Sequence, residues 1–325
     1  MPQKANLTLR TEEYQILKKV PYSKRLEVLY LESPKTHEQS VALRILNKKD
    51  FPAFQEKVQK ETEIQKYLQK SYSGKLNLPT RTFYQEGYIL APYAGEQLDE
   101  SLYSTLSPLT QQRVQQEFAE FLNYSHQKSL ESPKGLSNIP EHENIGKKAS
   151  SFLDVNIAQN LDKVVQAFSP FASESLKKHM KSIVDKMKTR DTSDEICVLV
   201  HNDLCPENVL YDSDKKRLSI IDYEYSFVGN IYNDFCHFGG PVFPKDFLSG
   251  VVDKYNVLTQ KSKHPCPISM EKLDLFMKAA ILNNQARWLK DWGRKPEDAF
   301  KEYLSRRKVL ADTKQTKTTK SKGRQ

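Results

Sequence analysis

His201, Asp203 and Asn208 are the polar side chains whose types and spacing point most directly to chemistry in this sequence. They follow the apolar residues 196–200, which predict a short buried strand, so we expect all three in the loop after it. A carboxylate in such a loop can accept a hydrogen bond from a substrate hydroxyl and take its proton. An amide oxygen five residues later suits a hard cation such as Mg²⁺.

A second carboxylate follows a predicted β-hairpin. Residues 209–211 and 218–221 are mostly apolar, and the turn-forming residues 212–215 separate them. The second predicted strand ends at Asp222, and Glu224 comes two residues later. The hairpin therefore carries acidic side chains at its end, where a metal ion could reach them.

Phosphoryl transfer needs an oriented nucleophile, a divalent cation on the phosphates and cationic side chains that position the nucleotide. Asp203 is the candidate base, and Asn208 and Asp222 are candidate Mg²⁺ ligands. Asp and Asn in loops are usually turn formers, but their spacing together with the strand and hairpin favours the catalytic interpretation. We group His201 with the catalytic residues, because its imidazole is expected to brace the loop. We expect Cys205 to be a packing residue.

The first part of the chain is rich in strand-forming residues. Short apolar runs alternate with turn-rich stretches, and they predict strands at residues 14–18, 26–31, 41–46, 81–84 and 88–91. Between the third and fourth, residues 54–68 show helical periodicity. Residues 92–96 break the pattern and mark a hinge.

Beyond the hinge the sequence is mainly helical. Apolar residues at helical spacing predict helices at residues 108–130, 152–168, 173–187, 247–258, 270–292 and 296–310. This order predicts an α+β fold with the bilobal layout of protein kinases: a small β-rich lobe with one main helix, then a larger helical lobe with a catalytic loop and hairpin. We expect a nucleotide-binding lobe at residues 1–94, a catalytic and substrate lobe at 95–312 and a disordered tail at 313–325.

The positive charge of the chain gathers at its end. The net charge is +9, but residues 313–325 hold five basic residues and no acid, which leaves +4 on the rest. A solubilising terminus is the favoured interpretation of this tail, with weak contact to an anionic surface as the alternative. We therefore do not expect nucleic acid as a partner.

The sequence also bears on location. No apolar run approaches the ~20 residues of a membrane span, and the first ten residues lack the apolar core of a signal peptide. Four cysteines without C-x-x-C spacing favour reduced thiols over a zinc site or disulfides. We predict a cytoplasmic protein, and the oligomeric state is left open.

Three segments resemble the choline/ethanolamine kinase branch of the aminoglycoside phosphotransferase superfamily. They are His-Asn-Asp-Leu-Cys-Pro-Glu-Asn at 201–208, Ile-Ile-Asp-Tyr-Glu-Tyr-Ser at 220–226, and Asp234, twelve residues after Asp222. The resemblance implies a kinase that uses ATP and Mg²⁺ to phosphorylate a small hydroxyl compound. It implies Asp203 as the base, with Asn208 and Asp222 on Mg²⁺.

The same resemblance implies roles for neighbouring positions. Glu224 would lie near the metal, and Tyr225 near the substrate. Trp288 and Trp292, one helical turn apart, could join Tyr225 in an aromatic cage for a quaternary ammonium, with two core tryptophans as the equal alternative. An amino alcohol such as choline or ethanolamine is therefore the first expected acceptor.

The N-terminal lobe offers candidates for ATP. Arg44, in Val-Ala-Leu-Arg-Ile, resembles the strand residue that contacts phosphates, and a guanidinium can hold two phosphate oxygens at once. Glu63 is the acid expected to orient it, with Glu61 as the alternative. Main-chain groups from Leu90 to Tyr93 would meet adenine at the hinge.

The sequence departs from this family in two places. Residues 19–25, where a phosphate-covering turn is expected, contain no glycine, so Ser23, with Lys24 beside it, is the candidate substitute. After Asp234 the family pattern continues with Asn-His-Phe and soon an acid, whereas residues 235–241 are one residue shorter and lack that acid. The second departure leaves the acceptor open.

Several alternatives therefore stand beside an amino-alcohol kinase. An aminoglycoside-type or thiamine-type kinase would keep the chemistry and change the acceptor. A pseudokinase that acts as a binding or scaffold module would account for the glycine-free turn, although Asp203, Asn208 and Asp222 are all present. A protein kinase is disfavoured because the chain has no Asp-Phe-Gly motif followed by Ala-Pro-Glu.

Overall fold

The computed structural model describes residues 14–21, 25–72, 74, 76–84, 87–148, 161–236, 245–291, 295–301 and 303–305. Close distances between Cα atoms divide the chain into two compact units. Unit 1 comprises Met1–Glu96 and Val209–Glu224, and unit 2 comprises Gln97–Asn208 and Tyr225–Gln325. The hairpin after the catalytic loop therefore groups with the N-terminal strands.

Unit 1 is built on a five-stranded antiparallel sheet in the order β1-β2-β3-β5-β4. Its strands are β1 (Gln15–Pro21), β2 (Leu26–Glu32), β3 (Gln39–Ile45), β4 (Thr82–Tyr84) and β5 (Tyr88–Pro92). Leu29, Leu31 and Ala42 are buried together, as expected where apolar residues alternate along neighbouring strands. All five strands overlap the strands that the sequence predicts.

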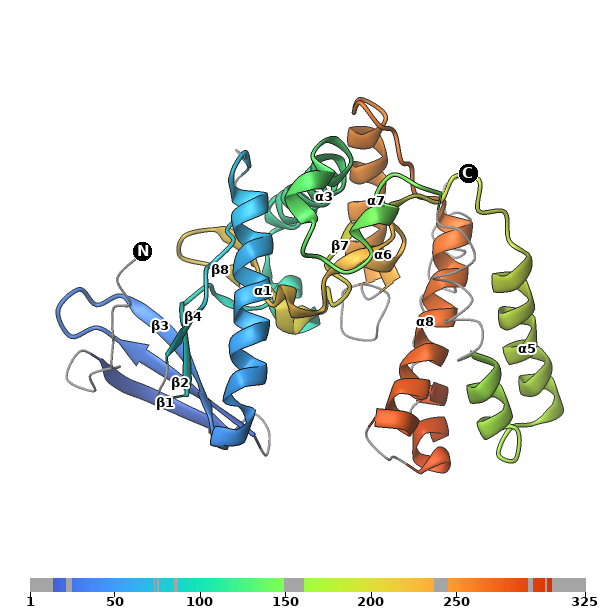
Figure 1. The fold of residues 1–325 in the computed structure, drawn as a ribbon, viewed down its shortest axis with the longest axis horizontal. Helices are drawn as coiled ribbons and strands as arrows, with labels where there is room; N and C mark the ends of the chain where they lie inside the picture. The colour runs from blue at the N-terminus through green and yellow to red at the C-terminus, as the bar shows by residue number, and fades with distance from the viewer. Residues whose placement is uncertain are drawn as a thin grey trace. The chain divides into compact units, whose positions relative to one another are not determined.

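Helix α1 (Phe51–Gln69) packs against this sheet and confirms the helix predicted over residues 54–68. Pro52 lies in its first turn, where the missing N–H costs no helical hydrogen bond. Val58 is buried in a cluster with Ile45 of β3 and Ile89 of β5. Figure 1 shows α1 running beside the strands of this unit.

The predicted hairpin forms from β8 (Val209–Asp212) and β9 (Arg217–Ile220), in a three-stranded sheet of order β6-β8-β9 with β6 (Glu96–Gln97). The Asp212 side chain closes its turn, because Oδ1 accepts the main-chain N–H groups of Asp214 and Lys215 at 3.1 and 2.9 Å. This is the role that makes Asp common in turns. The hairpin delivers the chain to Asp222.

Gly95 allows the chain to pass close to β8. Its φ is +113°, and a Cβ added there would lie 2.3 Å from the main-chain carbonyl carbon of Tyr211. A side chain in such a backbone conformation usually costs about 1–3 kcal/mol. We expect Gly95→Ala to lower the free energy of unfolding by more than this, because the clash adds to the strain. Urea unfolding measures the loss.

Gly146→Ala is the matched control for this variant. Gly146 also has a positive φ, +75°, but its added Cβ would meet only the Leu130 side chain at 3.7 Å, an ordinary contact. It should therefore show the strain without the clash, and a smaller loss. Equal losses in the two variants would contradict the role given to Gly95.

Unit 2 is mainly helical around one small sheet. Strands β7 (Cys197–Val200) and β10 (Phe227–Asn230) pair antiparallel. The helices are α2 (Glu100–Thr105), α3 (Pro108–Glu131), α5 (Glu174–Thr189), α6 (Asn233–Cys236), α7 (Lys245–Thr259) and α8 (Met270–Asp291). A β-rich N-terminal region followed by a mostly helical part is the α+β order that the sequence predicts.

The predicted helices fall on these elements wherever the structure describes the chain. The helix predicted over residues 152–168 is described only from residue 161, and residues 161–168 are helical. That predicted over 296–310 is described at 296–301 and 303–305, which are also helical. The predicted tail lies outside the described residues.

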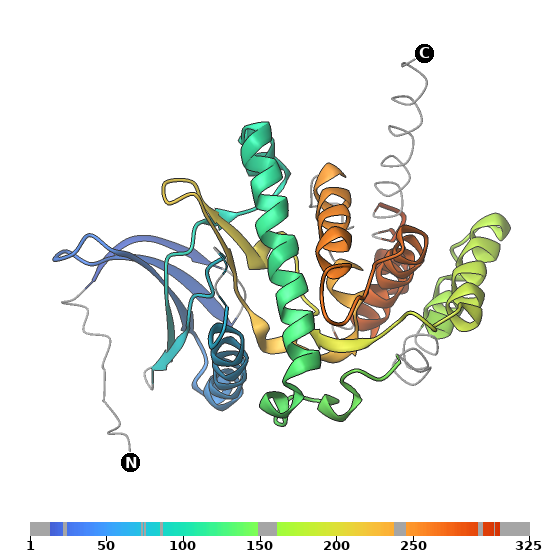
Figure 2. The same cartoon turned by 90° about the horizontal axis from the view of Figure 1, so that it is seen from above.

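Helix α3 is the central element of unit 2 and packs against α7 and β7 (Figure 2). Ser107 caps its N-terminus by accepting the main-chain N–H of Thr110 at 3.2 Å. Phe118 of α3 and Phe247 of α7 are fully buried and meet edge to face, with ring centroids 5.9 Å apart. This packing sets the position of the helices that support the catalytic loop.

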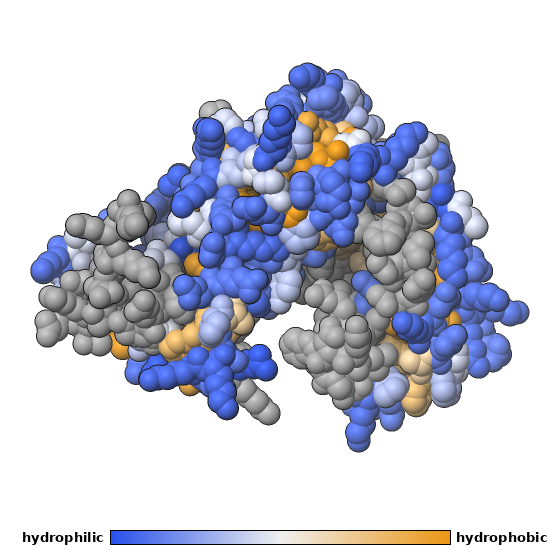
Figure 3. Space-filling view, viewed as in Figure 1, coloured by the Kyte–Doolittle hydropathy of each residue, from blue (hydrophilic) through white to orange (hydrophobic). Residues whose placement is uncertain are grey.

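The surface is mostly polar. Hydrophilic side chains cover most of the face drawn in Figure 3. Exposed large apolar residues such as Leu109 of α3 and Val257 of α7 lie on separate elements. Within the described ranges, no helix is both long enough and apolar enough to cross a membrane.

Candidate active site

The loop after β7 carries Asp203 in unit 2. All four residues of β7 are buried, and the strand ends directly before His201. Asn208 lies in the 3-10 turn Pro206–Asn208, where its Nδ2 donates to the main-chain oxygen of Asp203 at 2.8 Å and to Oδ2 at 3.0 Å. These bonds orient the carboxylate, as a general base requires. Because Nδ2 donates them, the amide Oδ1 of Asn208 is the acceptor that a cation could use.

His201 is buried within the same loop. Its Nδ1 accepts the main-chain N–H of Asp203 at 3.4 Å, and its main-chain oxygen accepts the Ser226 hydroxyl at 3.4 Å. Both contacts are long, but they join His201 to Asp203 of the same loop and to Ser226, which precedes β10. They agree with a bracing role for the imidazole, which stays a prediction.

A buried network fixes the loop from inside unit 2. Asn202 has a left-handed φ of +64°, and its main-chain N–H donates to Asp234 Oδ1 at 3.0 Å. Asp234 Oδ2 lies 3.1 Å from His126 Nε2, and His126 Nδ1 lies 3.0 Å from the Tyr255 hydroxyl. The network ties α3, α6 and α7 to the residue before Asp203.

The chemistry of Tyr255 indicates how the protons in this network are arranged. Burial raises the pKa of Tyr255 well above its ordinary value, so its hydroxyl keeps its proton. A hydroxyl that donates to His126 Nδ1 leaves Nε2–H to donate to Asp234. Asp234 could be identified from its sequence spacing to Asp222, but His126 could not, because a lone histidine on a helix gives no sign of its partner.

Cys205 lies in the catalytic loop beside the proposed base. Burial, followed by the nearby charge of Asp203, raises the pKa of its thiol to about 12. The thiol is therefore protonated at neutral pH and a poor nucleophile. This agrees with the packing role expected from the sequence.

In unit 1, Asp222 is held by its backbone and by its side chain. It has a left-handed φ of +70°, and its main-chain N–H donates to Glu61 Oε1 at 2.9 Å. Its Oδ1 is buried without a hydrogen bond and lies 3.4 Å from Arg81 Nη1. The same Nη1 lies 3.3 Å from Glu61 Oε2, so Arg81 bridges two acids.

Glu224 is also held by cations of unit 1. Its Oε1 lies 2.9 Å from Lys57 Nζ, and its main-chain oxygen accepts a hydrogen bond from Lys60 Nζ at 2.8 Å. Both lysines come from α1. Burial lowers the pKa of Lys60, although the charge of Glu224 opposes the shift.

The structure does not bring Arg44 and Glu63 together. Arg44 is half exposed on β3 and pairs with Glu27 across the sheet at 3.5 Å. Glu63 is exposed and accepts a hydrogen bond from Gln59 at 3.3 Å. Among the described residues neither Glu63 nor its alternative Glu61 contacts Arg44, since the buried Glu61 pairs with Arg81, and the orientation of Arg44 by an acid of α1 stays a prediction.

Helical geometry explains why Glu61 is the buried acid of α1 and Glu63 is exposed. Side chains that are two residues apart in an α-helix point to nearly opposite faces of the helix. Glu61 lies three residues after the buried Val58 and seven before the buried Leu68, so it shares their face and Glu63 does not. Arg81 gave no comparable signal, because it stands at the start of the strand predicted over residues 81–84, where the alternation of a strand does not name a partner.

The candidate adenine-binding residues lie in and after β5. Leu90 pairs with Ala42 of β3, and the main-chain N–H of Tyr93 donates to Gln39 at 3.0 Å. That N–H is therefore used within the sheet and is not available to a nucleotide. Ser23 lies outside the described residues.

The candidate substrate residues are described only in part. Tyr225 is 44% exposed in unit 2, where its ring could meet a small molecule. Trp288 lies in α8, but its side chain is outside the described part of the structure, and Trp292 is outside it altogether. The aromatic cage stays a prediction.

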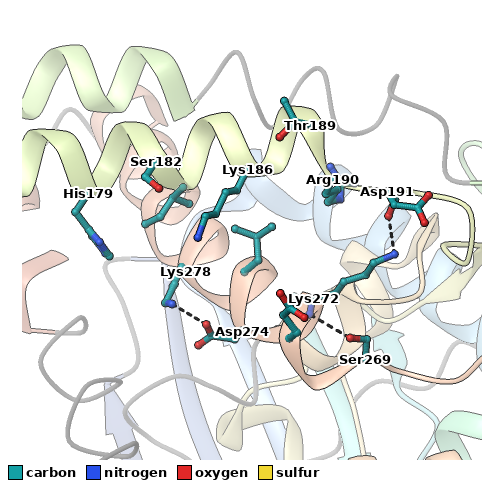
Figure 4. Close-up of a pocket in the computed structure, with 13 residues that line it drawn as sticks. His179, Ser182, Lys186, Thr189, Arg190, Asp191, Ser269, Lys272, Asp274 and Lys278 are labelled. Carbon is teal, nitrogen blue, oxygen red and sulfur yellow. Dashed lines mark hydrogen bonds and ion pairs between the residues drawn. The ribbon is translucent and has the colours of Figure 1, made fainter.

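A charged groove of about 550 Å³ lies between α5 and α8 of unit 2 (Figure 4). Three of its cations have acidic partners: Lys278 lies 2.6 Å from Asp274, Lys272 pairs with Asp194, and Arg190 pairs with Glu195. None of the predicted site residues lines it. The groove therefore carries no part of the candidate chemistry.

Each unit, taken by itself, holds an oxygen of the kind that Mg²⁺ binds. Asp222 offers a buried carboxylate oxygen without a hydrogen bond, and Asn208 offers an amide oxygen. Hard oxygens of this kind are what Mg²⁺ takes from a protein, with phosphates and waters as its other ligands. Among the residues that the structure describes, no three His, Cys, Asp or Glu side chains group closely enough to hold a metal by themselves.

Comparison with known proteins bears on the family and on the fold. The sequence pattern of the family "Choline/ethanolamine kinase" matches residues 22–239. Mouse ethanolamine kinase 2 is 44% identical over 50 residues, a match that spans 13% of this chain and 13% of the mouse protein. An ethanolamine kinase of Plasmodium vivax has a similar structure, with a TM-score of 0.53 and 14% identity over 93% of this chain and 81% of that one. This likeness confirms the kinase-like α+β fold predicted from the sequence.

Proposed function

Because the chain belongs to the choline/ethanolamine kinase family, we propose that it transfers the γ-phosphoryl group of Mg-ATP to the hydroxyl of a small amino alcohol. The observation that carries this proposal is the catalytic loop, in which Asn208 holds the Asp203 carboxylate in place and the buried Asp234 holds the backbone before it. A scaffold module would have no need of an oriented base. The proposed cofactors are ATP and Mg²⁺.

In the proposed reaction, the substrate hydroxyl donates a hydrogen bond to Asp203. As the hydroxyl oxygen forms its bond to the γ-phosphorus, its proton passes to Asp203. The bond between the γ-phosphorus and the bridging oxygen breaks, and its electron pair leaves with ADP. Asn208 and Asp222 are the proposed Mg²⁺ ligands, and Mg²⁺ when bound would neutralise charge on the phosphate oxygens.

Ethanolamine is the acceptor that we propose first. Both of the relatives described above are named as ethanolamine kinases. The two candidate acceptors differ in how a protein recognises them. The ammonium group of ethanolamine donates hydrogen bonds. The quaternary ammonium of choline donates none and is bound by aromatic faces. Tyr225 is the described aromatic residue that could contribute to either.

The test is ADP release by the purified chain with Mg-ATP and one acceptor at a time: ethanolamine, choline, kanamycin or thiamine. We expect release with the amino alcohols, with the higher kcat/KM for ethanolamine. Release with kanamycin or thiamine alone would move the protein to another branch of the superfamily. Nucleotide binding without turnover of any acceptor would favour the scaffold alternative.

Thermal unfolding with Mg-ATP gives an independent check on nucleotide binding. A ligand at a hundred times its dissociation constant stabilises the folded state by about 2.7 kcal/mol. A rise in Tm with Mg-ATP is expected even though residues 19–25 contain no glycine. An unchanged Tm at millimolar Mg-ATP would contradict the kinase proposal.

A further inference from the structure

Three cationic side chains converge on residues 222–224 of unit 1. Arg81 contacts Asp222, Lys57 contacts the Glu224 carboxylate, and Lys60 contacts the Glu224 main chain. The proposed Mg²⁺ ligand Asp222 is thus already paired with a protein cation. A side chain that binds a metal ligand directly should affect how the metal binds.

Arg81 is the best placed of the three to do so. Only 13% of its side chain is exposed, and its Nη1 lies 3.3 Å from Glu61 and 3.4 Å from Asp222. Glu61 in turn accepts the main-chain N–H of Asp222. These contacts close a ring of three residues that holds Asp222 in its left-handed conformation.

The charges in this region balance. Glu61, Asp222 and Glu224 carry three negative charges, and Lys57, Lys60 and Arg81 carry three positive ones. A free divalent cation would therefore meet a carboxylate whose charge is compensated, and it would have to displace or repel the Arg81 guanidinium. A nucleotide changes this balance, because its phosphates bring negative charge and offer the guanidinium other oxygens.

We propose that Arg81 is a positioning residue that holds Asp222 against Glu61 and competes with a free divalent cation for the Asp222 carboxylate. Metal then binds together with the nucleotide rather than before it. This inference rests on the proposed function, since it takes Asp222 as a Mg²⁺ ligand. It assigns to Arg81 a role that the sequence analysis gave to no residue.

The test measures Mn²⁺ binding to the full chain with and without ADP, using the EPR signal of free Mn²⁺. Arg81→Met alone could unfold the protein by leaving two buried acids without a cation. The double variant Arg81→Met with Glu61→Gln removes one charge of each sign, and the new amide oxygen can still accept the Asp222 N–H. We expect it to bind Mn²⁺ without ADP at least about tenfold more tightly than the wild type, because the cation that competes for the Asp222 carboxylate is gone, whereas the Glu61 oxygen nearest to Asp222 lies at its main-chain N–H.

Two controls accompany this variant. Arg81→Lys keeps the charge and should keep the weak binding of free Mn²⁺. Arg217→Met removes a charge from an exposed position of β9 in the same unit, so it should leave Mn²⁺ affinity unchanged if the effect is local.

The outcomes separate this inference from the proposed function. A folded double variant with wild-type affinity for free Mn²⁺ would overturn the role of Arg81, while the proposed function stands if the wild type binds Mn²⁺ with ADP. Equal tightening in Arg217→Met would also overturn it. A wild type that binds neither Mn²⁺ nor ADP would refute both.

Discussion

Asp203→Asn is expected to lower kcat by about 10²–10⁴-fold, the contribution typical of a positioned general base. The amide has nearly the size of the carboxylate and can still accept the hydrogen bond from Asn208 Nδ2, so the loop should keep its shape. It cannot take the proton of the substrate hydroxyl. ADP release measures the loss, and calorimetric titration with ATP should show nucleotide affinity close to that of the wild type.

Cys205→Ser provides the control for this variant within the same loop. The Cys205 thiol, with its pKa raised to about 12 by burial, is protonated and has no assigned part in the reaction. Its replacement should leave turnover near the wild-type rate. If Asp203→Asn retained that rate as well, another group would have to be the base.

Arg190→Met is expected to lower the free energy of unfolding by about 3–5 kcal/mol, the usual cost of removing one partner of a buried ion pair. Arg190 makes two hydrogen bonds to Glu195, Nε to Oε1 at 2.9 Å and Nη2 to Oε2 at 2.8 Å, and its guanidinium also lies over the Phe276 ring. The Glu195 side chain is fully buried, so its charge would lose its main compensation. Urea unfolding measures the change.

Lys177→Met removes an ion pair of the opposite kind. Lys177 pairs with Glu174 on the exposed surface of α5, where water compensates both charges. The free energy of unfolding should change by less than about 0.5 kcal/mol. Losses of similar size in the two variants would contradict the distinction between the buried and the exposed pair.

The parts of the fold that depend on local patterns could be predicted from the sequence. Alternating apolar residues gave the strands of unit 1, and helical periodicity gave α1, α3, α5, α7 and α8. The loop with Asp203 and Asn208 was predictable because strand, loop and hairpin follow one another within a short stretch. In each case the residues that determine the local structure are close to one another in the sequence.

The parts that depend on distant partners could not be predicted. Arg81 acquires its role from Glu61 and from Asp222, which is far away in the sequence. His126 acquires its role from Asp234, also a distant residue. Periodicity shows that a residue is buried or exposed, but it does not name the group that lies against it.

The choice between Glu61 and Glu63 is an intermediate case. Helical periodicity places Glu61 on the buried face with Val58 and Leu68, but the structure pairs it with Arg81 and not with Arg44. The expected partner Arg44 misled the choice, since the structure pairs it with Glu27. A buried acid on an apolar helix face was the more reliable sign of a specific ion pair.

Because Asp234, His126 and Tyr255 form a network, mutations that impair catalysis are expected at more positions than those of the catalytic loop. None of these three side chains is proposed to touch the substrate, yet through Asn202 they determine the backbone next to Asp203. Amino-acid changes within the cores of α3, α6 or α7 could therefore inactivate the protein without altering a substrate-binding residue. A survey of inactivating mutations should find them in these helices as well as in the catalytic loop.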